Sequence, residues 1–266
     1  MRPATVRPSA LPHLVVGGVA VAALYSVFFL LDRGDLARMT DEDGLVENLG
    51  AFCFLGAALV LARAGQLVRR AGQPRQGIWL LLLGALMLLC FAEEVSWGQR
   101  FLGIETPEAW KQANRQGETN LHNLSFFGAR FTADRLFSLF WFGYCCALPA
   151  AVRLVPALRR LVARLGVPLV PLGIGACFLL NHAVQKALEH PPVLEWITTR
   201  AVEREGGGLH DRLGAMGGLR QILEVKEALY GLLFLSVACW FLALGRSLLR
   251  VEEREEGRLA ASLESR

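Results

Sequence analysis

Long runs of apolar residues constrain this chain more than any other feature of its sequence. A helix needs about 20 apolar residues to cross the roughly 30 Å hydrocarbon core of a bilayer. Runs of that length predict six membrane-spanning helices, at Leu14–Leu31, Leu45–Ala64, Ile78–Ser96, Leu136–Val155, Val167–Leu188 and Ala228–Leu248. The mean hydropathy of +0.38 agrees with this interpretation. We therefore expect an all-α fold, a polytopic helical membrane bundle forming a single domain over residues 1–250, followed by a charged cytoplasmic tail over 251–266.

The positions of the arginines predict how the bundle is oriented. Arg-rich segments without acidic residues lie at Arg63–Gln76 and Arg153–Gly166, further arginines follow the last apolar run, and Arg2 and Arg7 precede the first. In a six-span topology these segments share one side, which the positive-inside rule assigns to the cytoplasm. We expect both termini to be cytoplasmic, the first span to be an uncleaved signal anchor, and the protein to lie in a bacterial inner membrane.

Charge and cysteine content argue against other classes of protein. The formal net charge is +4, but the arginines cluster between apolar runs and not on a separate basic face, so we expect no nucleic-acid partner. The 6 cysteines all lie within apolar runs and form no CxxC pair, which is typical of small packing residues and not of a disulfide framework. The oligomeric state does not follow from the sequence.

Two long loops are expected on the outer side, Trp97–Arg135 and Glu189–Glu227. Thr106-Pro107-Glu108 has the chemistry of a helix start, with a capping hydroxyl, proline in the first turn and an acid near the positive end of the helix. Residues 193–204 predict a second short interfacial helix, and the glycines at 206–208 predict a flexible break after it.

Polar side chains gather at the outer ends of the predicted spans. Each ionisable group in a membrane costs about 2.5–3.5 kcal/mol on insertion scales, so we expect partners, water or a cation to offset that cost. One shared cavity, opening outward between the second, third, fifth and sixth spans, would do so. The residues concerned are Glu47, Glu93, Glu94, Trp97, Gln99, Arg100, Asn120, His122, Asn123, Asn181, His182, Lys186, Glu224 and Glu227.

Within this set, the residue types suggest separate roles. Carboxylates and imidazoles transfer protons or bind metals, which makes Glu47, Glu93, Glu94, His122 and His182 the candidate catalytic residues. All of these except Glu47 are also the candidate ligands of a divalent metal such as zinc. The remaining residues of the set are candidates for substrate binding. Structural explanations stay open: Glu47 at the headgroup level, Glu93 or Glu94 paired with Arg100 or Lys186, and His122 as a loop hydrogen-bonding residue.

Two motifs resemble those of a known family. Glu93-Glu94-Val95-Ser96-Trp97-Gly98-Gln99-Arg100, followed by Asn120-Leu121-His122-Asn123, is similar to the EE-x-SWGQR and NLHN pair of an uncharacterised bacterial family of multi-pass membrane proteins. That resemblance covers about residues 40–130 and implies membership without an activity. A weaker similarity to ceramidase-like membrane hydrolases implies a zinc site. The chain departs from those hydrolases because it lacks an HxxxH pair, has six expected spans where they have seven, and carries Lys186 four residues after His182.

Three classes of function fit these features. The first is a membrane-embedded hydrolase or transferase, with or without a metal, acting on a lipid or lipid-linked substrate. The second is a proton-coupled transporter, which intramembrane acids and histidine suit. The one-sided distribution of polar residues and the lack of an internal repeat argue against that class. The third is a non-catalytic scaffold or assembly subunit whose outer loops bind a partner.

Overall fold

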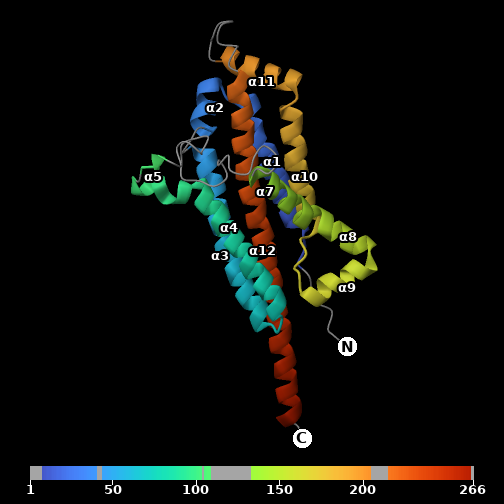
Figure 1. Ribbon diagram of the computed structural model, residues 1–266. Helices are drawn as coiled ribbons and strands as arrows, with labels where there is room; N and C mark the ends of the chain where they lie inside the picture. Colours follow the sequence, from blue (N-terminus) through green and yellow to red (C-terminus); the bar gives the residue numbers. More distant parts are fainter. Residues whose placement is uncertain (1–7, 41–43, 104, 109–132, 205–214, 265–266) are drawn as a thin grey trace.

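The computed structural model describes residues 8–40, 44–103, 105–108, 133–204 and 215–264, and every regular element within them is a helix (Figure 1). The chain order of these elements is α1 (Leu11–Leu30), α2 (Arg33–Thr40), α3 (Leu45–Arg70), α4 (Pro74–Glu94), η1 (Ser96–Gly98), α5 (Gln99–Leu102), α7 (Ala133–Trp141), η3 (Phe142–Ala147), α8 (Leu148–Leu154), α9 (Pro156–Leu165), α10 (Leu172–Leu188), α11 (Pro191–Arg204) and α12 (Ala215–Glu264).

Several helices have the length and composition that crossing a membrane requires. Among the described residues there are 5 such helical stretches. Two of them are the whole of α1 and the whole of α4. The other three are Gly34–Arg70, which includes α3; Arg135–Leu154, which is made by α7, η3 and α8; and Arg220–Leu263 within α12. The expected all-α fold with long apolar helices is therefore confirmed.

The fifth predicted span differs from the helix that forms there. Helix α10 begins at Leu172 and has 17 residues, where the apolar run had suggested a start at Val167. Two prolines, Pro168 and Pro171, explain the late start, because proline lacks an N–H and disfavours helix in the residue before it. The hydroxyl of Tyr144 donates a 3.0 Å hydrogen bond to the carbonyl of Pro168 and fixes this non-helical segment. At 1.5 Å per residue, α10 is about 25 Å long.

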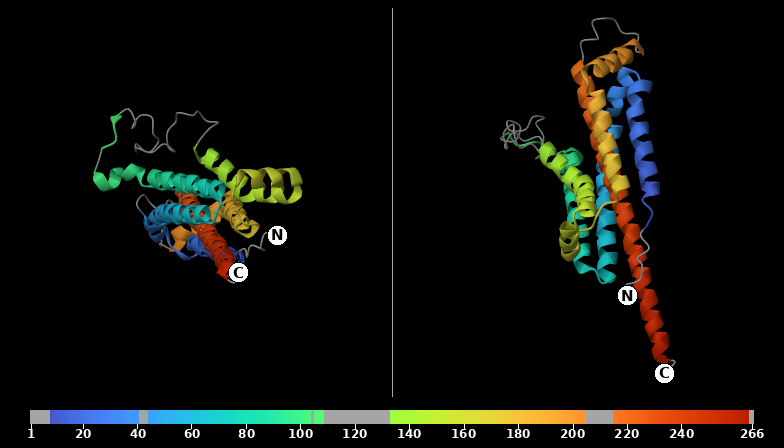
Figure 2. Two further views of the ribbon diagram at one scale, coloured as in Figure 1. Left: turned by 90° about the horizontal axis from the view of Figure 1, so that it is seen from below. Right: turned by 90° about the vertical axis from the view of Figure 1, so that its right-hand side faces the viewer.

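The longest element, α12, contains both the sixth predicted span and most of the predicted C-terminal tail. It is a single helix of 50 residues, Ala215–Glu264, and it runs the length of the bundle and projects beyond it at the C-terminus (Figures 1 and 2). Its first residues include Glu224 and Glu227, expected in a loop before the sixth span. The expected tail is the continuation of the same helix, since no proline interrupts the sequence between them.

Small residues let α12 approach α3 closely. A Cβ added at Gly231 would lie 2.5 Å from the carbonyl oxygen of Gly50, and one added at Gly50 would lie 2.8 Å from Cα of Ala228. Within a membrane, lipid tails are as apolar as leucine, so helices associate mainly through such close packing. Gly65 and Gly77 allow α3 to approach α4 in the same way, since a Cβ added at Gly65 would lie 2.9 Å from the carbonyl oxygen of Gly77.

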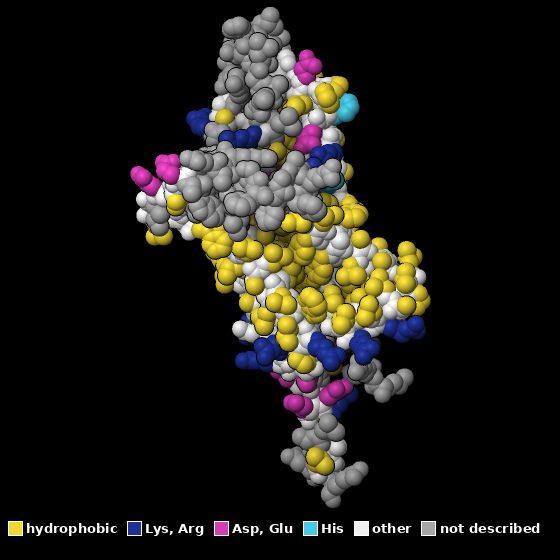
Figure 3. Space-filling view, in the orientation of Figure 1, with side chains coloured by type: hydrophobic (Ala, Val, Ile, Leu, Met, Phe, Trp, Pro, Cys, Tyr) yellow, Lys and Arg dark blue, Asp and Glu magenta, His cyan; other side chains and the backbone are white. Residues whose placement is uncertain are grey.

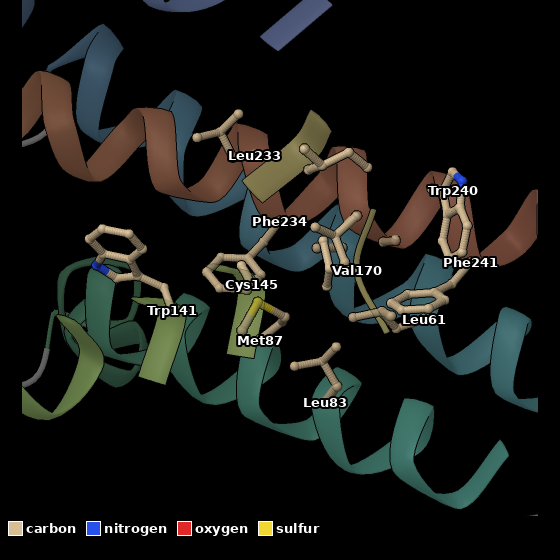
Figure 4. Close-up of a cluster of buried hydrophobic side chains, with 14 of the residues drawn as sticks. Leu61, Leu83, Met87, Trp141, Cys145, Val170, Leu233, Phe234, Trp240 and Phe241 are labelled. Atoms are coloured by element: carbon tan, nitrogen blue, oxygen red, sulfur yellow. The ribbon is translucent and has the colours of Figure 1, made fainter. Parts of the chain in front are cut away.

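Aromatic and aliphatic side chains fill the centre of the bundle (Figure 4). Met87 of α4, Cys145 of η3 and Phe234 of α12 are each 0% exposed and belong to one cluster. A second cluster, at the α11 end, packs Phe28 of α1 with Leu229 of α12 and residues of α2, α10 and α11. On the face drawn in Figure 3, a broad band of hydrophobic side chains lies between the two ends of the bundle, with Lys and Arg side chains along its lower edge.

Candidate functional site

The end of α4 folds into an unusual turn that carries the Glu93-Glu94 motif. After Glu94, Ser96, Trp97 and Gly98 all have positive φ, at 46°, 57° and 78°. This left-handed conformation suits glycine but costs other L-residues about 1–2 kcal/mol each. The turn brings Trp97 back over the helix, where its indole Nε1 donates a 2.6 Å hydrogen bond to Oε1 of Glu93. Strained backbone of this kind concentrates at functional sites.

A side-chain hydrogen bond connects α5 to the segment that follows it. The side-chain amide of Gln99 donates to Oγ1 of Thr106, and Thr106 is buried. Thr106 is therefore held by a side chain in the segment that follows α5, and the helix expected to follow it lies outside the described residues. The loop residues Asn120, His122 and Asn123 also lie outside them, and so does the side chain of Arg100.

Helix α10 presents a buried polar row to α1 and α12. Asn181 is 0% exposed and its Oδ1 accepts a 2.9 Å hydrogen bond from the hydroxyl of Tyr25. Its Nδ2 donates at 3.2 Å to the backbone carbonyl of Lys226. One amide side chain thus joins three helices. Amide groups buried at this depth lose solvation unless they are hydrogen-bonded, which Asn181 achieves on both its oxygen and its nitrogen.

Further along α10, Gln185 and Lys186 both contact the carboxylate of Glu189, the residue that follows the helix. Gln185 donates a 2.5 Å hydrogen bond to Oε1 of Glu189, and Lys186 forms an ion pair with Oε2 at 2.7 Å. Burial raises the pKa of Glu189, but the hydrogen bonds from Lys186 and Gln185 and the charges of Lys186 and Lys226 outweigh it and hold the pKa below its ordinary value. Lys186 therefore pairs with Glu189, three residues further along the chain, whereas the sequence had suggested Glu93 or Glu94 as its partner.

His182 lies beside the junction between α7 and η3. Its ring centroid is 5.8 Å from that of Trp141, the last residue of α7. Directly after Trp141 the chain forms the π-helix Phe142–Ala147, a conformation frequent at functional sites. Gly175 makes the close approach of α10 to η3 feasible, since a Cβ there would lie 2.3 Å from the carbonyl oxygen of Cys145.

The predicted glutamates of α3 and α12, Glu47, Glu224 and Glu227, are half-buried. Glu47 lies in the first turn of α3. On α12, Glu224 Oε1 is 3.7 Å from Nε of Arg220, and Glu227 Oε1 is 3.3 Å from Nζ of Lys226. The backbone carbonyl of Lys226 accepts the hydrogen bond from Asn181, so Glu227 is the next residue in the chain after this contact between α10 and α12.

Apart from the glutamates of α3 and α12, the predicted residues in the described part of the chain form two groups. Glu93, Glu94, Trp97 and Gln99 belong to the end of α4 and its turn, whereas Asn181, His182 and Lys186 belong to α10. These two helices lie on opposite sides of α12 (Figures 1 and 2). Among the described residues, no three His, Cys, Asp or Glu side chains are placed to hold a metal ion. A site joining both groups through His122 stays a prediction.

Tyr25, Gln185 and Trp141 contribute to the polar and aromatic surroundings of α10 but were not among the predicted site residues. A signal existed for Tyr25 and Gln185: each is a hydrogen-bonding side chain within an apolar run. Trp141 carried no such signal, since interfacial tryptophans are common in membrane proteins.

Neither a protein-family model, nor a curated protein, nor a solved structure matches this chain. The function must therefore be argued from the arrangement of its own residues.

Proposed function

We propose that this protein is a six-span integral protein of a bacterial inner membrane, with both termini in the cytoplasm and α10 as the fifth span. The arginines at the α3–α4 turn and on α9 support this orientation, because basic residues are retained on the cytoplasmic side. The polar ends of α4 and α10 then face the outer leaflet. A span as short as α10 is accommodated by local thinning of the bilayer or by flanking polar side chains.

We further propose that the outer end binds a lipid or lipid-linked substrate and acts on it as a hydrolase or transferase. The observation that carries this proposal is the polar row of α10, in which His182 directly follows the fully buried Asn181. Asn181 is held from α1 and α12, so the backbone that carries His182 is fixed in position. An imidazole that changes charge near neutral pH is the usual choice for proton transfer.

Other residues would complete such a site. Glu93, at the strained turn, supplies a carboxylate oriented by Trp97. Lys186 is 58% exposed at its side chain although it pairs with Glu189, so it retains donors for an anionic headgroup. His122, the fourth of the expected metal ligands, lies outside the described residues, so acid–base chemistry through His182 and a metal route both remain part of the proposal.

The experiment is a conversion assay on purified protein in lipid nanodiscs with radiolabelled bacterial lipids, resolved by chromatography. We expect a new labelled product with the native protein, none with His182→Ala, and retained conversion with His190→Ala, an exposed histidine beyond the same helix. Metal analysis of the same samples tests the metal route. Conversion that survives His182→Ala would overturn the role given to His182. A native protein that converts no lipid leaves the scaffold reading as the better one.

A further inference from the structure

A groove lies at the end of the bundle opposite to α11, where α3 turns into α4. Its volume is about 850 Å³, within the range of ligand-binding pockets. Three parts of the chain enclose it: the α3–α4 turn, the end of α9 with the segment that follows, and the distal part of α12. Its lining residues are Ala71, Gly72, Gln73, Pro74, Arg75, Gln76, Val162, Ala163, Arg164, Gly166, Val167, Leu248, Val251, Glu252 and Glu255.

Side chains of both charges line this groove, and among the described residues they form no ion pairs with each other. Arg75 comes from the start of α4, Arg164 from α9, and Glu252 and Glu255 from α12. Within the described residues, the guanidinium of Arg75 donates to the backbone carbonyl of Arg164 at 2.9 Å, and none of the four side chains forms an ion pair. Oε2 of Glu252 is buried and has no hydrogen-bond partner there. A buried carboxylate oxygen without a partner is costly, which points to a ligand with donor groups.

The walls and the position of the groove point to a lipid. Val162, Val167 and Leu248 give it an apolar side. The indole of Trp79 donates a 3.2 Å hydrogen bond to the carbonyl of Leu165, which lies in sequence between the lining residues Arg164 and Gly166. The side chains of Trp79 and Leu165 are 42% and 48% exposed. A tryptophan beside the end of an apolar helix is typical of the membrane–water interface. The groove therefore opens where headgroups and acyl chains meet.

We propose that this groove binds the headgroup of a phospholipid that carries a primary ammonium group, as phosphatidylethanolamine does. The two arginines would bind the phosphate, for which planar guanidinium groups are well suited. Glu252 and Glu255 would accept hydrogen bonds from the ammonium, and the acyl chains would lie against the apolar wall. A headgroup with both charges satisfies both pairs of side chains at once.

Other lipids fit this arrangement less well. A phospholipid with only a negative headgroup would leave the two glutamates unpaired beside its phosphate. A choline headgroup has the right charges but no N–H to donate to Glu252, and proteins bind such quaternary ammonium groups with aromatic cages instead. The groove's described lining contains no aromatic residue. The proposal requires only that the chain is embedded in a membrane, and it does not depend on the reaction proposed for the outer end.

The test measures binding of defined lipids to the full-length protein in detergent by native mass spectrometry. We expect dipalmitoyl phosphatidylethanolamine to bind at least tenfold more tightly than the matching phosphatidylcholine or phosphatidylglycerol. The double variant Glu252→Gln/Glu255→Gln should lose the preference for ethanolamine over choline while still binding both. Arg164→Gln should weaken both phospholipids. Glu253→Gln and Arg160→Gln, which change the same helices outside the groove, should leave all affinities unchanged.

Two results would overturn the proposal. One is equal binding of the ethanolamine and choline lipids by the native protein, or a preference that survives the double glutamine substitution. The other is displacement of the lipid by equimolar glycerophosphoethanolamine, which has the same headgroup without acyl chains and would identify a soluble phosphodiester as the ligand. A failed lipid-conversion assay at the outer end would leave this test unaffected.

Discussion

The hydroxyl of Tyr25 donates a 2.9 Å hydrogen bond to Oδ1 of Asn181, so two helices far apart in sequence share one buried polar contact. Tyr25 is 3% exposed and Asn181 0%. Because the nitrogen of the same amide binds the carbonyl of Lys226, this contact fixes α1, α10 and α12 relative to one another. The polar end of α10 is thereby held by its packing and does not depend on the outer loops.

Removing that hydroxyl should destabilise the bundle. We expect Tyr25→Phe to lower the free energy of unfolding by about 0.5–2 kcal/mol, because the fully buried Asn181 Oδ1 loses its donor. Ser26→Ala is the control, since its hydroxyl is exposed and bonds only within α1. Reversible denaturation by sodium dodecyl sulfate measures both. The interpretation is wrong if the two variants have equal stability.

Close packing of α3 against α12 makes a second prediction. Gly231→Ala should cost about 1–3 kcal/mol, because the new methyl group would lie 2.5 Å from the Gly50 carbonyl oxygen and force the helices apart. Gly18→Ala, on α1, has nothing within 4 Å and should be neutral or stabilising by up to about 1 kcal/mol through helix propensity. Thermal unfolding in one detergent compares them. Similar melting temperatures for both variants would contradict the packing described here.

The fold class was predictable because a helix that crosses a membrane needs a run of about 20 apolar residues, and such runs can be recognised in the sequence. The bounds were less so. Two features overrode the hydropathy pattern: Pro168 and Pro171, which delay the start of α10, and the absence of proline or a terminating glycine, which lets α12 continue from Ala215 to Glu264. In both cases backbone chemistry, and not side-chain polarity, decides where the helix ends.

The candidate site was predictable residue by residue but not in its connections. Hydropathy singles out Asn181 and Glu93 because each is polar where the surroundings are apolar. Which helix each one meets depends on how the helices pack, and the glycines at 50, 175 and 231 set that packing through contacts distant in sequence. The partner of Lys186 shows the same limit: Glu189, three residues away, binds it at 2.7 Å.

The turn after α4 allows backbone strain to be separated from the indole contact. Trp97→Asn and Trp97→Val both remove the hydrogen bond to Glu93, but asparagine tolerates a φ of 57° and valine does not. We expect the valine variant to be less stable than the asparagine variant by about 1 kcal/mol. Parallel chemical denaturation of the two proteins gives that difference. Equal stabilities would mean that the turn relaxes without cost.

Glu189 makes stability depend on acidity. Burial alone would raise its pKa, but the hydrogen bonds from Lys186 and Gln185 and the charges of Lys186 and Lys226 outweigh burial and lower the pKa in the folded protein. The ionised form therefore stabilises the fold above the ordinary carboxyl pKa of about 4.3, and this contribution is lost as the pH falls through the lower folded value. In Glu189→Gln the loss of melting temperature between pH 6 and pH 3 should be smaller than in the native protein. Glu195→Gln, on the exposed face of α11, should retain the native pH dependence.

The proposed orientation can be tested with single cysteines and a membrane-impermeant maleimide on intact cells. Glu105→Cys and Glu195→Cys lie at exposed positions of the end that we assign to the outer side, and they should be labelled without lysis. Ser9→Cys and Gly257→Cys are also exposed but belong to the opposite end, so they should react only after the membrane is opened. The native protein, whose 6 cysteines lie in apolar segments, serves as the background.

The physical basis is the retention of arginine-rich segments in the cytoplasm, which applies at once to the α3–α4 turn, α9 and the distal part of α12. Labelling of Ser9→Cys in intact cells would mean that the N-terminus lies outside and that the first span has the opposite orientation. Labelling of Gly257→Cys with Ser9→Cys protected would instead require an odd number of spans, and α10, the shortest of the six, would then be the helix that does not cross.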